Sequence, residues 1–399
     1  MNLFPPLTLQ LKSHMDELLK TIDKTFPLPR RFRPGLPKDV AELSALFTSR
    51  RYERSLSYLG KPNLLSAYLR YFLPWNVYRL CRLLPSLNLE LKTGDAILDL
   101  GSGPLSFVLA LWFSRPDLRD IPLEFYCIDQ TPSVLEAGRK IFGAITSPEN
   151  TADKIKWKIK TLRGELGRNG HILINRKIVG PEQICNGKGA ALVCAVNVYN
   201  EIFWELSPAD KDGLRNLAEQ NSRLLCSCGK DCSVLIVEPG IPRSGAFISG
   251  LRSSLIEQGF EINSPCPHNE SCSFPGEGKG KAKWCHFPFN TDDAPELLHK
   301  LSNAAGIPKE RAVMSFLFAH NSSHIKSQKK ARNSTQVRVI SDSFPVGRLY
   351  GRYACSVQGP VLATGSKAKM ETIDSGSLIN VNINGNRDQK SGALTGEVL

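Results

Sequence analysis

The stretch that decides the fold of this chain is Ala96-Ile-Leu-Asp-Leu-Gly-Ser-Gly-Pro104. A short apolar run ends in two glycines and is followed at once by the apolar segment 105–114, which predicts a strand, a tight turn and a helix. Glycine lets the backbone approach a ligand closely, and the first N–H groups of a helix have no intrahelical partner. Asp99 adds a carboxylate at the end of the strand. The pattern therefore predicts a nucleotide-type pocket.

The spacing of the glycines narrows the class of ligand. Gly101-x-Gly-Pro104 differs from the Gly-x-Gly-x-x-Gly of dinucleotide-binding folds, and Asp-x-Gly-x-Gly is typical of S-adenosylmethionine-dependent methyltransferases. Residues 123–129 predict a second strand, and Asp129 at its end can accept hydrogen bonds from the ribose hydroxyls of a nucleoside cofactor. Alternatively, Asp129 only caps the helix that begins near Pro132. The two roles are compatible.

Strands and helices continue to alternate as far as residue 237. The sequence predicts strands at 155–162, 190–196 and 233–237, a helix at 208–225, and a polar insertion at 164–189 that holds a short hairpin. This order predicts an α/β fold with a doubly wound, Rossmann-like parallel sheet, which binds ligands at the carboxyl ends of its strands. The candidate cofactor-binding residues at that edge are Asp99, Gly101, Ser102, Gly103, Pro104, Asp129 and Asn197.

The composition indicates the kind of partner and the compartment. Lys and Arg exceed Asp and Glu by 51 to 38, so the surface is expected to attract polyanions such as RNA; the alternative is a basic protein kept soluble by its charge. No apolar run reaches the roughly 18 residues of a membrane span. Eleven cysteines without a signal or transit pattern predict a reducing compartment, and we expect a bacterial-type cytoplasm.

Four cysteines in the second half of the chain are candidate metal ligands. They are Cys266, Cys272, Cys285 and Cys355, separated by 5, 12 and 69 residues. Thiolates ligate soft metals, and four of them saturate a tetrahedral zinc ion or a 4Fe-4S cluster. Structural zinc usually has tighter Cys-x2-4-Cys spacing, so the gaps favour a cluster and leave zinc open.

Other thiols and imidazoles are weaker candidates. His268 and His286 could replace cysteines in a zinc site, but we expect them to donate hydrogen bonds or face solvent. The strip Cys226-x-Cys228-x3-Cys232 resembles a metal knuckle, yet it fills the tight link between a predicted helix and a buried strand. We therefore expect these three cysteines to bind no metal.

The chain divides into four predicted regions. Residues 1–90 form a helical region, 91–262 the cofactor-binding domain, 263–363 a cysteine module, and 364–399 a disordered tail rich in Gly, Ser, Asn and Lys. The basic segment 326–332 is a candidate RNA contact.

Within the cysteine module, residues 337–340 and 355–362 predict two strands of a small barrel-like sheet. This sheet is expected to lie beside the metal site.

Several motifs together resemble the methyltransferase-like small-ribosomal-subunit family, whose members occur in mitochondria and bacteria. The motifs are Asp99-Leu-Gly-Ser-Gly-Pro104, Glu238-Pro-Gly240, Cys266-Pro-His-x3-Cys272, Trp284-Cys-His-Phe287 and Gly351-Arg-Tyr-Ala-Cys355, and the resemblance covers roughly residues 36–362. It implies S-adenosylmethionine in the sheet pocket, a 4Fe-4S cluster on the four cysteines, and the small ribosomal subunit and its rRNA as partners, with no membrane or DNA partner.

The resemblance has two departures and leaves the catalytic residues unknown. Leu105 stands where a further glycine usually follows Gly-Pro, and Pro288-Phe-Asn290 replaces an expected x-Gln-Arg. We expect an S-adenosylmethionine- and 4Fe-4S-binding protein that acts on the small subunit as an assembly factor or rRNA methyltransferase. The alternative is a non-catalytic, zinc-containing RNA-binding module on a methyltransferase scaffold.

Overall fold

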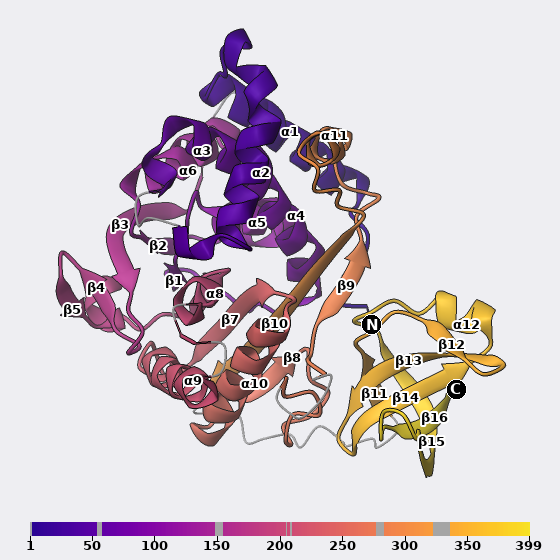
Figure 1. Ribbon diagram of the computed structural model, residues 1–399. Helices are drawn as coiled ribbons and strands as arrows, with labels where there is room; N and C mark the ends of the chain where they lie inside the picture. The colour runs from indigo at the N-terminus through magenta and orange to yellow at the C-terminus, as the bar shows by residue number, and fades with distance from the viewer. Residues whose placement is uncertain are drawn as a thin grey trace.

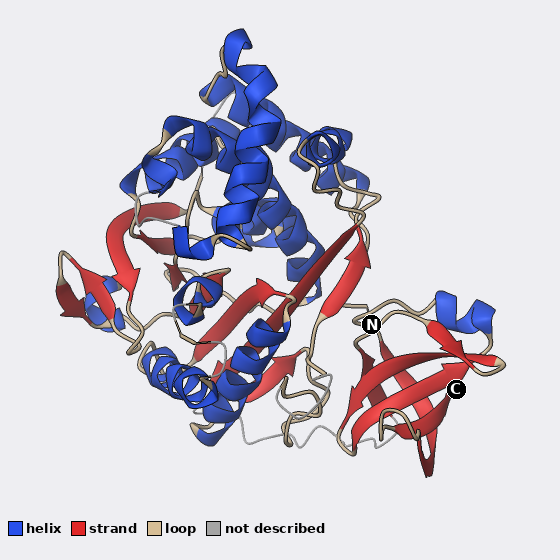
Figure 2. Ribbon diagram, in the orientation of Figure 1, coloured by secondary structure: helices blue, strands red, loops and turns tan. Residues whose placement is uncertain are grey.

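A computed structural model describes residues 2–53, 58–147, 155–204, 206–207, 210–276, 283–321 and 336–399. These residues form one ten-stranded sheet covered by helices and one six-stranded sheet that curls into a small barrel (Figures 1 and 2). No helix in the described ranges is long and apolar enough to cross a membrane.

The N-terminal region is helical, as the spacing of its apolar residues predicts. Its main helices are α1 (Leu9–Thr25), α2 (Leu36–Phe47), α3 (Pro62–Ala67) and α4 (Leu73–Leu83). A π-helical turn, Tyr68–Phe72, joins α3 to α4. Such turns are rare and frequently occur at functional sites.

The ten-stranded sheet has a parallel centre. Its strands are β1 (Ala96–Leu100), β2 (Glu124–Asp129), β3 (Lys158–Leu166), β6 (Leu192–Val196) and β7 (Cys232–Pro239), in the order β3-β2-β1-β6-β7. Every adjacent pair in this set is parallel. The sequence therefore predicted the strand-helix alternation and the parallel sheet correctly.

Both faces of this sheet are covered. Helices α5 (Ser106–Ser114), α6 (Pro132–Ile145), α9 (Lys211–Cys226) and α10 (Pro242–Glu257) connect its strands. Along β1, Ile97 joins the core beneath the N-terminal helices, whereas Leu98 and Leu100 join the core on the other face. A strand buried on both faces is expected to be largely apolar, and in β1 only Asp99 departs from this pattern.

The sheet continues beyond its parallel centre at both ends. The hairpin of β4 (Ile172–Ile174) and β5 (Lys177–Val179) extends it past β3, within the predicted insertion, and α7 (Pro181–Ile184) follows. Strand β10 (Arg311–Asn321) lies antiparallel between β7 and β8 (Glu261–Ser264), and β9 (Phe287–Asn290) pairs with its first half. The short helix α8 (Tyr199–Phe203) follows β6, and α11 (Glu296–Ala304) precedes β10.

The second sheet is a closed barrel. It contains β11 (Gln336–Val339), β12 (Phe344–Val346), β13 (Leu349–Ser356), β14 (Gly359–Gly365), β15 (Leu378–Arg387) and β16 (Leu394–Val398), with α12 (Lys367–Glu371) between β14 and β15. Strand β11 pairs with both β13 and β15, and β14 is parallel to β16. Without β12, the five strands have the Greek-key connectivity of an OB-fold.

Three predictions about this half of the chain were wrong. The tail predicted to be disordered, residues 364–399, contains α12, β15 and β16, because those strands close the barrel. The single strand predicted at 355–362 is a hairpin with its turn between Ser356 and Gly359. The boundary predicted at 262/263 does not separate two sheets, since β8, β9 and β10 belong to the first one.

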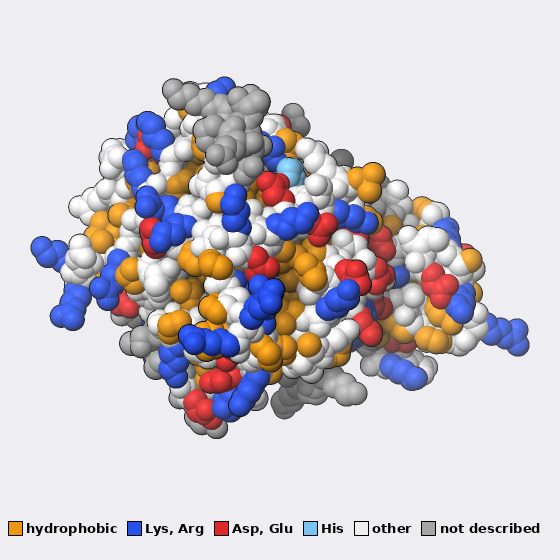
Figure 3. Space-filling view, turned by 90° about the horizontal axis from the view of Figure 1, so that it is seen from above, with side chains coloured by type: hydrophobic (Ala, Val, Ile, Leu, Met, Phe, Trp, Pro, Cys, Tyr) orange, Lys and Arg blue, Asp and Glu red, His pale blue; other side chains and the backbone are white. Residues whose placement is uncertain are grey.

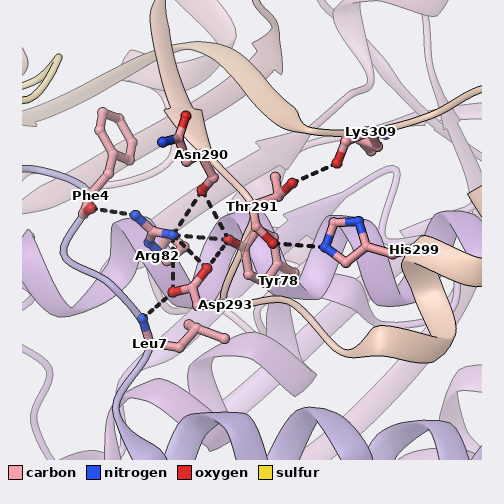
Figure 4. A network of polar contacts seen from close by, with 9 residues as sticks. All are labelled: Phe4, Leu7, Tyr78, Arg82, Asn290, Thr291, Asp293, His299 and Lys309. Atoms are coloured by element: carbon pink, nitrogen blue, oxygen red, sulfur yellow. Dashed lines mark hydrogen bonds and ion pairs between the residues drawn. The ribbon is translucent and has the colours of Figure 1, made fainter.

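A buried ion pair fixes the N-terminal segment and α4 to the loop after β9 (Figure 4). Arg82 of α4 contacts Asp293 at 2.9 Å, and both side chains are nearly inaccessible. Arg82 also donates to the carbonyl of Phe4, while the amide of Leu7 donates to Asp293 at 2.6 Å. The same helix carries Asn76 and Arg79, so this network holds the helix that covers the edge of the sheet.

Candidate functional site

A cavity of about 570 Å³ lies between the N-terminal helices and the carboxyl edge of the parallel strands. Gly101, Gly103, Asp129 and Asn197 line it, together with side chains of the helical region such as Tyr68. Its volume is within the range of small-molecule sites. Four of the seven candidate cofactor-binding residues therefore surround one cavity.

The glycine turn allows this close approach. Gly101 and Gly103 have φ angles of +62° and +54°, which side chains rarely adopt. A Cβ atom on Gly101 would lie 2.3 Å from a methyl of Val198, and one on Gly103 would lie 3.7 Å from the Tyr68 hydroxyl. The turn thus requires glycine at position 101 for both conformation and space.

Asp129 supports the turn from the neighbouring strand. One carboxylate oxygen accepts the N–H of Gly103 at 3.0 Å, and the other accepts the N–H of Thr131 at 2.8 Å. Burial raises the pKa of Asp129, which these hydrogen bonds partly offset. Each oxygen keeps a lone pair, so support of the turn and acceptance of ribose hydroxyls can coexist, as the sequence suggested.

The other three candidates, Asp99, Ser102 and Pro104, belong to the strand end and the turn but do not line the cavity. Asp99 is buried and accepts hydrogen bonds from Ser102 at 2.5 Å and from the thiol of Cys194 at 3.2 Å. Burial raises the pKa of Asp99 to about 7. Pro104 packs against α6, where a Cβ on Gly138 would come within 2.4 Å of its carbonyl carbon. These residues shape the turn from below.

Leu105 occupies a conformation that usually requires glycine. Its φ is +61°, and its side chain is fully buried. The left-handed conformation costs a non-glycine residue roughly 1–2 kcal/mol. Leucine in place of the expected glycine at position 105 therefore strains the backbone, and burial of the leucine side chain offsets this cost.

Asn197 joins the strand edge to the covering helix. It lies after β6 with φ of +58°, and its side-chain amide donates to Asn76 of α4 at 3.3 Å. Arg79 donates to Asn76 at 2.5 Å and to Asn197 at 3.4 Å. These contacts set a guanidinium group over the end of β6.

Glu238, at the end of β7, has a structural role at the same edge. Its carboxylate accepts the N–H groups of Tyr199 at 2.8 Å and of Asn200 at 3.1 Å, at the start of α8. The side chain is completely buried, and burial raises its pKa to about 7. Its oxygens are therefore occupied by backbone donors.

The sequence did not point to two cations that line this cavity, Arg79 and Lys309. Burial lowers the pKa of Arg79 to about 10, and burial together with the positive charge of Arg79 lowers that of Lys309 to about 7. The Lys309 ammonium lies 5.1 Å from the ring centre of Trp75 and 5.7 Å from that of Tyr71. Only tertiary packing brings α4 and the residue before β10 together, so local sequence carries no signal.

The four predicted metal ligands come together at the contact between the first sheet and the barrel. Burial raises the pKa of Cys285, and charges on Cys266, Cys272 and Cys355 would raise it further. Cys355 lies on the outer face of β13, because its neighbour Ala354 belongs to the barrel core and Cys355 to the core of the first sheet. This position explains how a residue 70 positions from Cys285 reaches this site. The other three thiols are therefore near enough to Cys285 to act on it electrostatically.

Two buried arginines face these thiols. Arg252 donates to the sulfur of Cys266 at 3.3 Å and to the carbonyl of His268 at 2.9 Å. Arg338 of β11 donates to the carbonyl of Pro265 at 2.9 Å, and its electrostatic partners include the Cys266 thiol. Guanidinium groups beside thiols favour their thiolate form.

As the side chains lie, no three or more Cys, His, Asp or Glu residues in the described ranges form a group that could hold a metal ion. The 4Fe-4S cluster and the zinc alternative therefore remain proposals. His268 lies 3.3 Å from the sulfur of Cys355, consistent with a hydrogen-bonding role. His286 instead contacts the carbonyl of Trp284 at 3.0 Å.

The segment 226–232, whose cysteines resemble a metal knuckle, lies at the amino ends of the parallel strands, away from the cavity. Cys228 and Cys232 are buried beside the start of β7, and Cys226 and Cys185 are close enough to influence their pKa values. Cys228 donates to the carbonyl of Leu224 at 3.3 Å. Within the described ranges these thiols are core residues.

The outer face of β13 and β14 is the surface on which OB-folds bind oligonucleotides. Here it faces the chain's own cysteine segment: Lys283 lies 4.6 Å above the Tyr353 ring and donates to the carbonyl of Ser391, and Ser273 donates to the carbonyl of Ser356. This part of the barrel is therefore engaged within the molecule. The predicted RNA contact at 326–332 lies outside the described residues.

Comparison with protein families finds a similarity over part of the second half of the chain. A family model described as "Mitochondrial small ribosomal subunit Rsm22" matches residues 213–345, from α9 into the barrel. Residues 213–345 resemble the Rsm22 family. The match confirms the resemblance to a small-ribosomal-subunit family that the cysteine motifs predicted. No curated protein matches the sequence.

Solved structures similar to this chain include methyltransferases. Fibrillarin of Aeropyrum pernix with bound S-adenosyl-L-methionine is 16% identical, covers 61% of this chain and 76% of its own, and has a TM-score of 0.28. The plantazolicin methyltransferase BpumL with SAH is 11% identical, covers 78% and 99%, and has a TM-score of 0.30. YjhP of E. coli is 13% identical, covers 62% and 92%, and scores 0.29. These TM-scores are too low to assign a fold, so the fold assignment rests on the strand order of the sheet.

Proposed function

We propose that this chain binds S-adenosylmethionine at the carboxyl edge of its first sheet and acts on the small ribosomal subunit, as a methyltransferase of its rRNA. The observation that carries the donor assignment is the cavity in which Asp129 holds the glycine turn open through the Gly103 N–H. A carboxylate at the end of β2, next to a glycine turn after β1, suits the ribose and the amino-acid end of a nucleoside donor.

The small-subunit assignment is supported by the family match over residues 213–345. The excess of Lys and Arg supports an RNA partner, and Figure 3 shows these side chains scattered over one face of the molecule among acidic and hydrophobic ones. Phosphate contacts by such cations supply affinity without base recognition. The chemical step uses a donor bound at β1 and β2 and an acceptor base that enters above β6, beside Asn197.

The experiment is to crosslink the protein to RNA in cells, map the RNA, and compare small-subunit rRNA modifications with and without the gene. We expect crosslinks in small-subunit rRNA and one modification that disappears on deletion and returns with the wild-type gene but not with Asp129→Asn. Crosslinks without any lost modification would instead favour a non-catalytic assembly factor. Crosslinks confined to other RNAs would refute the small-subunit assignment.

We further propose that Cys266, Cys272, Cys285 and Cys355 ligate a 4Fe-4S cluster. The proposal is supported by four neighbouring thiols, by the hydrogen bond from Arg252 to Cys266, and by the affinity of thiolates for iron. When bound, the cluster would link the segment between β8 and β9 to strand β13 of the barrel. The protein supplies the four thiols and, on Arg252 and Arg338, two positive charges that would balance their thiolates.

Iron and acid-labile sulfide analysis of anaerobically purified protein tests this assignment. We expect a brown protein that absorbs at about 400 nm, as 4Fe-4S proteins do. Cys355→Ser should lose the metal, whereas the matched control Cys228→Ser, at the opposite edge of the sheet, should keep it. A colourless protein with stoichiometric zinc would support the zinc alternative and contradict the cluster.

A further inference from the structure

Two cations, Arg79 and Lys309, line the cavity. In the described residues, neither Arg79 nor Lys309 makes an ion pair with an Asp or Glu side chain, although both line the cavity. Arg79 donates from one terminal nitrogen, Nη2, to the amide oxygens of both Asn76 and Asn197. The ammonium of Lys309 lies against the rings of Trp75 and Tyr71.

Two carboxylates at this edge of the sheet already accept backbone N–H groups. Glu238, the acidic group that acts on Arg79, accepts two backbone N–H groups at the start of α8. Asp129 accepts the N–H groups of Gly103 and Thr131. Burying a positive charge beside another is costly unless an anion compensates. The part of the cavity that Arg79 and Lys309 line therefore favours a negatively charged ligand group.

The position of these cations in the sheet indicates which ligand supplies that group. Asp129 ends β2, whereas Lys309 precedes β10, and the order β2-β1-β6-β7-β10 puts four strand spacings between them. At the usual 4.8 Å per strand this is about 19 Å. Arg79 lies between, over the ends of β6 and β7. The cations thus lie on the side of the cavity away from the ribose position.

We propose that Arg79 and Lys309 form a subsite for a phosphodiester group of the polynucleotide that enters the cavity as methyl acceptor. The guanidinium group contacts phosphate oxygens through a planar pair of donors, and the ammonium adds a point charge. Aromatic rings behind Lys309 hold its ammonium toward the cavity without neutralising it. The subsite deepens the proposed function, because it assigns a nucleic acid, rather than a small neutral molecule, to the acceptor side.

The test is a titration of the full-length protein with a fluorescein-labelled single-stranded RNA of mixed sequence at several KCl concentrations. Lys309→Met should weaken binding about tenfold and reduce the slope of log Kd against log[KCl] by about 0.7, the value of one phosphate contact on a single strand. Lys309→Arg should retain the slope. The matched control is Lys230→Met, which removes the same charge from an exposed position before β7, at the opposite edge of the sheet. It should leave the slope unchanged.

A second arm separates the phosphate from the carboxylate of the donor. S-adenosylmethionine and 5′-methylthioadenosine, which lacks the amino-acid end, are titrated against the same variants. Unchanged affinity of Lys309→Met for both, together with the reduced salt slope, supports the phosphate subsite. Selective loss of S-adenosylmethionine affinity with an unchanged RNA slope would overturn it in favour of a donor-carboxylate contact.

The subsite and the proposed function can fail separately. A wild-type protein that binds neither nucleoside would refute the donor site, while the RNA slopes would still decide the role of Lys309. If Lys309→Met does not fold, as judged by its thermal midpoint, Lys309→Gln and Arg79→Gln provide the same comparison. A wild-type slope in both of these would overturn the proposal.

Discussion

Replacing Asp129 by Asn tests the link between the glycine turn and the donor. The carboxylate accepts backbone N–H groups with both oxygens, from Gly103 at 3.0 Å and from Thr131 at 2.8 Å. An amide has one acceptor oxygen, so one N–H would face an NH₂ group. The lost charge-assisted hydrogen bond costs roughly 1.5–3 kcal/mol, and removing a buried charge recovers part of this cost. We expect a net destabilisation of about 1–2 kcal/mol.

The loss of donor affinity should exceed the loss of stability. Without the second acceptor oxygen, one ribose hydroxyl loses a charged partner worth roughly 2 kcal/mol, which is about 30-fold in Kd. Calorimetric titration with S-adenosylhomocysteine measures this change, and scanning fluorimetry measures the midpoint, which should fall by about 2–8 °C. The control Asp120→Asn removes an exposed carboxylate that pairs with Lys156 and should change neither quantity appreciably. Wild-type affinity in folded Asp129→Asn would refute the reasoning.

Three further predictions concern stability. Because the pKa values of Asp99 and Glu238 are raised by burial to about 7, the folded protein binds protons more tightly than the unfolded chain between about pH 4 and 7, so the free energy of unfolding should fall as pH rises from 5 to 7. Urea titrations should show this fall, reduced in Asp99→Asn; a rise would contradict it. Arg82→Met should destabilise by about 3–5 kcal/mol in chemical denaturation, because Asp293 keeps an unpaired buried charge, and Asp293→Asn added to it should restore much of the loss. Deleting residues 378–399 should unfold the barrel and expose its core to limited proteolysis, whereas a disordered tail could be removed without effect.

The parallel sheet could be predicted because each of its central strands has a recognisable local sequence pattern. Ala96–Leu100 and Leu192–Val196 are buried on both faces and are therefore almost entirely apolar, with Asp99 as the one carboxyl side chain. Their carboxyl ends meet at one edge, so residues that follow them, such as Asn197, could be assigned to one site.

The sequence predicted two strands of the barrel, but β15 and β16 were missed because they are buried on one face only. In β15, Ile379, Val381 and Ile383 alternate with asparagines, and the stretch is rich in residues that are rare in strands. The alternation is visible in the sequence, but the composition resembles that of a disordered segment. Pairing with β11 and β16 supplies the missing stabilisation.

The sequence pointed to the cysteines of the candidate site but not to the two cations of the cavity. Cys266 and Cys355 were grouped by residue type and family motif, and the structure brings them together across two sheets. Arg79 and Lys309 belong to no motif, and their proximity depends on how α4 packs over the sheet. Asp99 was predicted as a cofactor-binding carboxylate, but its oxygens accept hydrogen bonds from Ser102 and Cys194 beneath the turn.

The most direct test of the central claim is ultraviolet crosslinking of isotope-labelled S-adenosylmethionine to the full-length protein, followed by peptide mapping. The account predicts about one label per chain, in peptides that contain the turn at Gly101–Gly103 or the end of β2 at Asp129, and loss of label on competition with S-adenosylhomocysteine. Absence of competable labelling, or labelling confined to the barrel residues 336–399, would contradict it.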